Sequence, residues 1–272
     1  MNRLFHALFL LILPLILVGC THLHPKTKSL FSNLTGPEKL RVGITVDAPP
    51  LAYKKDGTLT GLETKFAAGL ARATGKTLEL VELPRQELAP ALVEKKIDII
   101  MSGLTATSAQ SRDLAITKPY LISSQIALVH LDDFKQLGNS VRNLTEPKVR
   151  LGVVAGTAGE NLVKELNPKE ETTRFASAPE GVQALLDDTI DAFIYDLPAN
   201  FYYASLYVDK GLTPGVKPMT IEQLVWAVHP DNTELLKAAN TYLATIRQNG
   251  ELNALLERSI PFYKNTAYSP KK

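Results

Sequence analysis

The chain is poor in cysteine and in net charge. Its single cysteine, Cys20, rules out a disulfide within one chain. A total of 30 Lys and Arg residues against 28 Asp and Glu residues leaves a formal net charge of +2, which favours neither nucleic acid nor an anionic surface as a partner. No nucleophile–base pattern or metal-ligand constellation is present, because the pair His22 and His24 has no Asp or Glu nearby to complete a site. We therefore expect no metal, no cofactor and no nucleic acid partner.

Only the N-terminus carries a long apolar run. Leu4 to Val18 follows the basic residue Arg3, is short for a membrane span and has the length of a signal-peptide core. The next residues, Gly19-Cys20, resemble the processing site of bacterial lipoproteins, at which the cysteine is lipidated. We expect a signal peptide at 1–19, lipid on Cys20 and a polar tether at 20–38 that holds the rest at the membrane, on the periplasmic or outer side. An uncleaved anchor helix is the alternative.

The rest of the chain alternates strand and helix patterns twice. Apolar alternation and β-branched residues predict strands, and apolar positions one turn apart predict helices. The first series has strands at 40–45, 78–83 and 97–101 with helices at 61–75 and 87–95, and the second has strands at 150–154 and 190–195 with helices at 160–166 and 180–188. Such a series is typical of a parallel sheet with helices on its faces. Two further helices are predicted at 233–248 and 251–258.

One stretch, from Ile97 to Val129, combines a buried strand with a polar turn. The strand breaks at Ser102-Gly103 into a Thr- and Ser-rich segment, and a helix pattern begins near Ser108. Thr105 and Thr107 stand just before the predicted helix, where a ligand carboxylate would meet the positive end of the helix dipole. The alternative is that these hydroxyl residues only cap a surface helix.

Three segments resemble one protein family. GLTATSAQSRDLAITKPYLISSQIALV, Gly61-Leu62-Glu63 and the C-terminal AANTYLATIRQNGELNALLERSIPFY are similar to segments of the extracellular solute-binding proteins that serve amino-acid importers of the ATP-binding-cassette type. The resemblance covers about Leu40 to Tyr263.

The resemblance implies an α/β periplasmic-binding-protein fold of type II with two lobes, each a mainly parallel sheet flanked by helices. Lobe 1 is expected at 39–128 and 228–264, and lobe 2 at 129–227. The strand-like runs 126–129 and 224–228, the second of which contains Trp226, are expected to cross between the lobes as a two-strand hinge. Such a protein, expected as a monomer, closes on a small amino acid or related polar solute and delivers it to a membrane permease, with no bond made or broken.

The resemblance also carries ligand roles to individual positions. Asp196 falls at the carboxylate that holds the α-ammonium group of the ligand, while the hydroxyls of Thr105, Thr107 and Thr157 and the backbone of Gly103 fall at donors to its carboxylate. Asp196 also follows a predicted parallel strand, at the edge where open α/β sheets bind ligands. The full set of expected ligand-binding residues is Thr45, Arg85, Gly103, Thr105, Thr107, Gln110, Thr157 and Asp196.

Three positions depart from the family pattern. The arginine that usually clamps the carboxylate is Gln110 here, and Arg112 would point to a different side of the helix. The aromatic residues that usually sandwich the ligand side chain are replaced by Ala48 and Arg85. Arg85 either reaches into the cleft to take an anionic group of the ligand, or points into water at the cleft rim. The sequence leaves both accounts open.

Other classes of function are open on the same fold. Periplasmic dehydratases of prephenate-like substrates resemble these proteins, and such an enzyme needs a positioned acid or base, for which Glu160 is the nearest candidate. A sensory ligand-binding protein is a further alternative, and it would need another domain after Tyr263. A nucleotide is disfavoured, because the glycine spacing at 156–159 does not match the dinucleotide fingerprint and no P-loop lysine follows.

Overall fold

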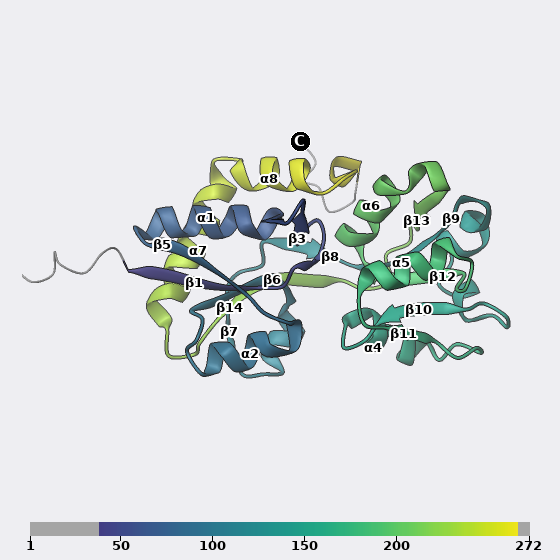
Figure 1. Cartoon of the computed structure of the whole chain (residues 1–272), viewed down its shortest axis with the longest axis horizontal. Helices are drawn as coiled ribbons and strands as arrows, with labels where there is room; N and C mark the ends of the chain where they lie inside the picture. Colours follow the sequence, from purple (N-terminus) through teal and green to yellow (C-terminus); the bar gives the residue numbers. More distant parts are fainter. Residues whose placement is uncertain (1–37, 266–272) are drawn as a thin grey trace, which may run out of the picture. The chain divides into compact units, whose positions relative to one another are not determined.

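The computed structural model describes residues 38–265, which form two α/β lobes on separate sheets (Figure 1). The predicted signal peptide, Cys20 and the tether up to residue 37 lie outside the described residues. Within 38–265, no helix combines the length and the apolar character needed to cross a membrane.

The first lobe is built on a six-stranded sheet of order β5-β1-β6-β14-β7, in which β8 also pairs with β14. Its strands are β1 (Lys39–Ile44), β5 (Thr77–Glu82), β6 (Ile99–Thr105), β7 (Ala115–Ile116), β8 (Leu121–Ser123) and β14 (Glu222–Val228). The strands β5, β1 and β6 are parallel, as predicted, whereas β14 runs antiparallel to its neighbours. The carboxyl ends of β1, β5 and β6 therefore lie at one edge of the sheet.

Helices cover both faces of this sheet. The helices α1 (Leu62–Thr74), α7 (Thr233–Gln248) and α8 (Glu251–Ser259) share one apolar core with the strands, while α2 (Arg85–Val93) and α3 (Ala106–Gln110) share another on the opposite face (Figure 1). The apolar stripe of α1, with Leu62, Phe66 and Leu70 fully buried, follows the helical repeat. The helix ends at Gly75, whose φ of 67° suits glycine.

The second lobe repeats this plan on a five-stranded sheet of order β11-β10-β12-β9-β13. Its strands are β9 (Gln125–His130), β10 (Leu151–Val154), β11 (Thr173–Phe175), β12 (Ala192–Asp196) and β13 (Leu212–Pro214). The strands β11, β10 and β12 are parallel, and β9 is antiparallel to β12 and β13. The helices α5 (Ala178–Leu186) and α6 (Leu197–Leu206) cover one face, and α4 (Ala158–Leu166) covers the other (Figure 1).

Several short elements complete the described chain. A small sheet of β2 (Asp47–Ala48), β3 (Ala52–Lys55) and β4 (Thr58–Thr60) links β1 to α1. Single helical turns are present at η2 (Leu131–Asp133), η3 (Phe134–Gly138), η4 (Asn143–Thr145), η5 (Val208–Lys210) and η6 (Tyr263–Asn265).

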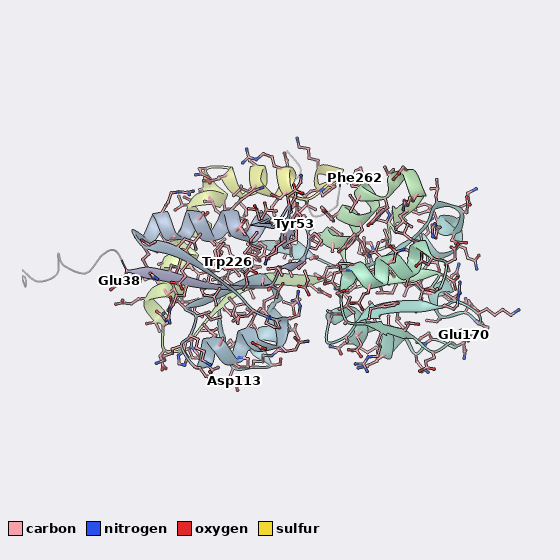
Figure 2. The ribbon with its side chains drawn as sticks, viewed as in Figure 1. Glu38, Tyr53, Asp113, Glu170, Trp226 and Phe262 are labelled. Carbon is pink, nitrogen blue, oxygen red and sulfur yellow. The ribbon has the colours of Figure 1, made fainter. Side chains whose placement is uncertain are left out.

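The predicted hinge strands do not cross between the lobes. All of β9 belongs to the second sheet and all of β14 to the first, so the chain passes between lobes at Ser124 and at residues 215–221. Both expected lobe boundaries therefore move by several residues towards the N-terminus. Trp226 is fully buried in the first lobe rather than on a crossing strand (Figure 2). The alternating pattern of these runs predicts a strand, but it carries no information about which sheet the strand joins.

Hydrogen bonds join the two crossing segments to each other. The hydroxyl oxygen of Ser124 accepts the backbone N–H groups of Met219 at 3.1 Å and Thr220 at 3.2 Å. In return, the N–H of Gln125 donates to the Thr220 hydroxyl at 2.8 Å. The connection between the lobes is thus a compact pair of polar segments.

Candidate functional site

A cavity of about 160 Å³ is lined by both lobes at the carboxyl ends of their strands. The first lobe supplies the end of β6 and the first turns of α2 and α3, and the second supplies the segment before α4 and the end of β12. The lining residues are Arg85, Gln86, Leu88, Ala89, Ile100, Ser102, Gly103, Leu104, Thr105, Ser108, Arg112, Leu114, Ala155, Gly156, Thr157, Ala158, Tyr195 and Asp196. Open α/β sheets bind ligands at this edge, because the carboxyl ends of parallel strands and the N-termini of the following helices meet there.

The cavity brings together Arg85, Gly103, Thr105, Thr157 and Asp196 of the predicted set. Their role as ligand contacts remains a prediction. Ser102 and Tyr195 also line the cavity and were not predicted.

The structure corrects the placement of Thr107 and Gln110. Both are exposed and neither lines the cavity, whereas Thr105, Ser108 and Arg112 do. Residues three or four apart share a helix face, so the face of α3 that carries Ser108 is a different one from the face that carries Thr107 and Gln110.

Thr45 is also outside the cavity lining. It is buried behind Ser102, with its N–H donating to the Ser102 hydroxyl oxygen at 2.9 Å. The Ser102 hydroxyl in turn donates to the Thr45 hydroxyl at 3.2 Å. Thr45 therefore supports the wall of the cavity and does not form its surface.

Two predicted donors to a ligand carboxylate already have acceptors within the protein. The N–H of Gly103 donates to Glu63 at 2.9 Å, and the hydroxyl of Thr157 donates to the carbonyl of Val154 at 2.7 Å. The Thr105 hydroxyl accepts the N–H of Ser108 at 3.2 Å as the cap of α3, which leaves its own hydrogen for another acceptor. Among the predicted residues that line the cavity, Thr105 is thus the one whose hydroxyl hydrogen remains available for a ligand.

A buried carboxyl group, Glu63, lies behind the cavity wall and binds the backbone of Gly103, which lines the cavity. Besides the Gly103 N–H, it accepts the hydroxyl of Tyr120 at 2.6 Å and the indole N–H of Trp226 at 3.0 Å. Its side chain is fully buried, and this burial raises its pKa to about 7 against the opposing effect of the three donors. Glu63 therefore joins α1, β6 and β14 at the strand end that faces the cavity. No local sequence pattern indicates this role, because the three donors lie far from Glu63 in the chain.

Arg85 begins α2 and lies on the cavity wall opposite Asp196. Pro84 precedes it at the helix cap, a position that suits a residue in extended backbone. Its guanidinium makes one long contact, 3.5 Å from Nη1 to the carbonyl of Ser102. Among residues 38–265 it forms no ion pair with an acidic side chain. Arg85 is half-buried and lines the cavity, and its contact with a ligand stays a prediction.

Asp196 ends β12 and is held by an amide. The Nε2 group of Gln125 donates to Asp196 Oδ1 and to both carboxyl oxygens of Glu222 at 3.1 Å. Burial raises the pKa of Asp196, and the hydrogen bond from Gln125 and the positive charge of Arg85 oppose this rise. Gln125 is fully buried, and a Cβ at Gly159 would come within 2.9 Å of its carbonyl oxygen. The glycine in the first turn of α4 thus makes room for the amide that positions Asp196.

Glu160, the candidate acid for catalysis, lies outside the cavity lining. Its carboxylate forms ion pairs with Lys164 at 3.0 Å and Arg174 at 2.7 Å, and it accepts the N–H of Gly156 at 2.7 Å. These contacts, led by the Gly156 N–H, lower its pKa, so the carboxyl holds no proton to donate near neutral pH.

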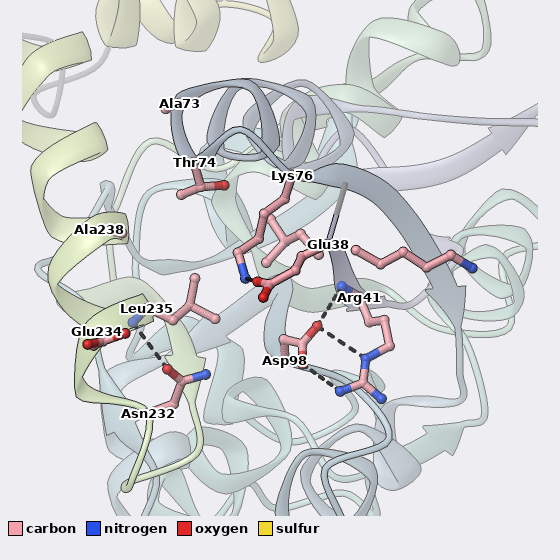
Figure 3. Close-up of a pocket in the computed structure, with 12 residues that line it drawn as sticks. Glu38, Arg41, Ala73, Thr74, Lys76, Asp98, Asn232, Glu234, Leu235 and Ala238 are labelled. Atoms are coloured by element: carbon pink, nitrogen blue, oxygen red, sulfur yellow. Dashed lines mark hydrogen bonds and ion pairs between the residues drawn. The ribbon is translucent and has the colours of Figure 1, made fainter. Parts of the chain in front are cut away.

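A larger charged cavity, of about 800 Å³, lies at the opposite edge of the first sheet (Figure 3). Four of its six charged side chains are paired with one another, Arg41 with Asp98 at 2.6 Å and Lys76 with Glu38 at 2.8 Å. Because this edge carries the amino ends of β1 and β6 and most of its charges already have partners, it is a poorer candidate for a ligand site.

Comparisons with known proteins agree with this geometry. The family model described as bacterial extracellular solute-binding proteins, family 3, matches residues 40–261. The arginine-binding extracellular protein ArtP of Bacillus subtilis is 26% identical over 231 residues, which cover 82% of this chain and 87% of that protein. The L-cystine-binding protein TcyJ of Escherichia coli K12 is 27% identical over 221 residues, which cover 80% and 81%. Among solved structures, an ancestral amino acid-binding protein, AncCDT-1, a precursor of cyclohexadienyl dehydratase, is 30% identical with a TM-score of 0.73, and the match covers 82% of this chain and 95% of that one.

Proposed function

The chain belongs to the bacterial extracellular solute-binding proteins of family 3, and we propose that it captures an amino acid between its lobes and delivers it to an importer of the ATP-binding-cassette type. The relatives named for arginine and cystine support an amino acid as the ligand class. The observation that carries the proposal is the pair of Asp196 and Arg85 in one cavity, each supplied by a different lobe. Within residues 38–265 neither side chain forms an ion pair with an oppositely charged one.

Each end of an amino acid has a matching group in this cavity. Asp196 suits the α-ammonium group, because a carboxylate accepts several charge-assisted hydrogen bonds. Arg85, the Thr105 hydroxyl and the backbone N–H groups at the start of α4 suit a carboxylate, since the first N–H groups of a helix have no acceptor within it. A hydrogen bond to a charged group contributes about 1.5–3 kcal/mol, so two such contacts supply about 3–6 kcal/mol of the roughly 8 kcal/mol that micromolar binding requires. Further polar contacts and packing supply the rest.

Binding by lobe closure follows from the two crossing segments. The ligand bridges groups on both lobes, so it stabilises the arrangement in which those groups are close together. Rotation at Ser124 and at residues 215–221 changes the distance between lobes without breaking either sheet. We propose binding without chemistry, because Glu160 is ion-paired outside the cavity lining.

We further propose that the chain is a lipoprotein. Cys20 carries the lipid, and the polar segment 20–38 connects it to the first strand at Lys39. Replacing Cys20 with Ser removes the acylated thiol, so the variant should leave the membrane fraction or retain its signal peptide. A correctly processed variant that still needs detergent for extraction would contradict this assignment.

Equilibrium binding tests the main proposal. The purified chain is screened with the standard amino acids by thermal shift, and each positive result is titrated by calorimetry. We expect at least one amino acid to bind, and we expect Asp196→Ala to weaken it about 30-fold or more, because truncating one partner of a desolvated charge pair costs 2 kcal/mol or more. Gln110→Ala, an exposed position outside the cavity, is the matched control and should change affinity by less than about twofold. Failure of every amino acid to bind would overturn the proposal.

A further inference from the structure

We propose that the ligand is an acidic amino acid, one that carries a side-chain carboxylate in addition to its α-carboxylate. This inference rests on the proposed function and names the substrate class of the same cavity. The inference starts from the net positive charge of the cavity wall. A cationic amino acid would instead require a net negative wall.

The charged groups on the cavity wall are two guanidinium groups and one carboxylate. Arg85 and Arg112 come from the first lobe and Asp196 from the second. Arg112 is exposed at the rim, where its Nη1 donates to the carbonyl of Ser108 at 3.0 Å and to the Ser108 hydroxyl. Arg85 has only the 3.5 Å contact to a carbonyl, and among residues 38–265 no acid is bound to it.

No acidic side chain among residues 38–265 forms an ion pair with Arg85, and this includes Asp47 and Glu82, which line a neighbouring cavity with it. Glu63 is saturated by its three donors, and Glu222 accepts from Gln125 and, at 2.9 Å, from the hydroxyl of Thr220. Asp196 lies close enough to feel the charge of Arg85 but is bound by the Gln125 amide. Among residues 38–265 neither wall arginine forms an ion pair, and Arg85 is the less exposed of the two.

Charge balance then selects among amino acids. A zwitterion places its ammonium on Asp196 and offers a single carboxylate to a wall that carries two guanidinium groups. One of these groups is then left without an anion as the lobes exclude water. An unpaired charge removed from water is strongly unfavourable. A second carboxylate on the ligand removes this penalty, and the planar fork of arginine fits a carboxylate with two parallel hydrogen bonds. A cationic side chain would instead add a like charge to a wall that already carries two.

Isosteric ligand pairs test this on the unaltered protein. L-Glutamate and L-glutamine, and L-aspartate and L-asparagine, differ by one charge at nearly constant size, and L-arginine and L-lysine supply the opposite charge. Calorimetry at fixed ionic strength measures the dissociation constant for each. We expect one acidic member to bind about tenfold or more tightly than its amide and more tightly than either cationic amino acid.

Variants then assign the preference to Arg85. Arg85→Gln should reduce the ratio of acid to amide affinity to about one, and Arg85→Lys should keep part of it, since lysine retains the charge but loses the fork. The matched control is Arg142→Gln, which removes the same charge from a side chain that is 89% exposed and outside the cavity, and it should leave the ratio unchanged.

The possible outcomes separate this inference from the proposed function. An amide or a cationic amino acid that binds most tightly to the unaltered protein would overturn the inference and leave the proposed function standing. An acid preference that survives in Arg85→Gln would overturn the role given to Arg85. If no amino acid binds at all, both the inference and the proposed function fall.

Discussion

Arginine and aspartate residues lie at both edges of the sheets, but among residues 38–265 they bind each other only at the edge that carries the amino ends of the parallel strands (the amino edge). At the amino edge of the first sheet, Arg41 binds Asp98 through Nη2 at 2.6 Å, Nε at 3.2 Å and its backbone N–H at 2.8 Å. The second lobe repeats this clamp, with Arg150 binding Asp191 at 2.5, 3.1 and 2.7 Å through the same three groups. At the carboxyl edge, Arg85 and Asp196 face one cavity without binding each other.

The difference lies in where each partner sits in the chain. Asp98 and Asp191 directly precede β6 and β12, so each lies beside the arginine of the neighbouring strand within its own lobe. Arg85 and Asp196 belong to different lobes, and their distance depends on how the lobes are arranged. Ion pairs within a lobe serve stability, whereas separated charges across a cavity are free to bind a ligand.

Glu63 contributes both to stability and to the cavity, because it binds core residues and a residue that lines the cavity. We expect its replacement to have the largest effect on stability. Glu63→Ala leaves the Tyr120 hydroxyl, the Trp226 indole N–H and the Gly103 N–H buried without an acceptor. The free energy of unfolding, measured by urea titration, should fall by about 2–4 kcal/mol. Ligand affinity should fall as well, since Gly103 lines the cavity. A variant with unchanged stability would show that the three donors do not depend on Glu63.

The pH dependence of stability tests the protonation of Glu63. Its pKa is 4.5 in its ordinary state and about 7 in the folded chain. Between these values the folded chain holds a proton that the unfolded chain has released, so this group makes stability fall as pH rises, by about 3 kcal/mol in all. Between about pH 5 and about pH 8, the free energy of unfolding of Glu63→Gln should therefore decline less than that of the unaltered protein. Equal declines in the two proteins would place the pKa of Glu63 near its ordinary value.

The two amino-edge clamps should give smaller effects, confined to stability. Arg41→Ala removes a half-buried bidentate pair and should lower the free energy of unfolding by about 1–2 kcal/mol. Arg150→Ala should have a smaller effect, about 0.5–1 kcal/mol, because its side chain is 47% exposed against 35% for Arg41. Neither should change ligand affinity beyond about twofold in calorimetry. A marked loss of affinity in either variant would mean that the amino edge also takes part in binding.

The alternation of strands and helices could be predicted from the sequence because it depends on local periodicity. The helix predicted at 233–248 has the bounds of α7, and the parallel strands β1, β5, β6, β10 and β12 fall where apolar and β-branched residues indicate them. Asp196 was expected at the binding edge because it follows a parallel strand, and Thr157 because of the family resemblance; both line the cavity.

What could not be predicted depends on long-range pairing. The strand β6 was expected to end at Met101, but pairing of Leu224 in β14 with Thr105 extends it through Gly103. The turn therefore comes later, and Thr107 and Gln110 fall on the exposed side of a short helix. The Glu63 network likewise joins residues far apart in sequence, such as Trp226, so no local pattern announces it.

The role of Asp196 as the ammonium-binding group is the central claim, and one comparison tests it directly. The amino acid that binds most tightly is compared by calorimetry with its analogue that has hydrogen in place of the α-amino group, which for L-glutamate is glutarate, in both the unaltered protein and Asp196→Asn. We predict that removing the amino group weakens binding about 30-fold or more in the unaltered protein and less than about threefold in Asp196→Asn, because the variant has already lost the charge that holds the ammonium. The same loss in both proteins would contradict the claim.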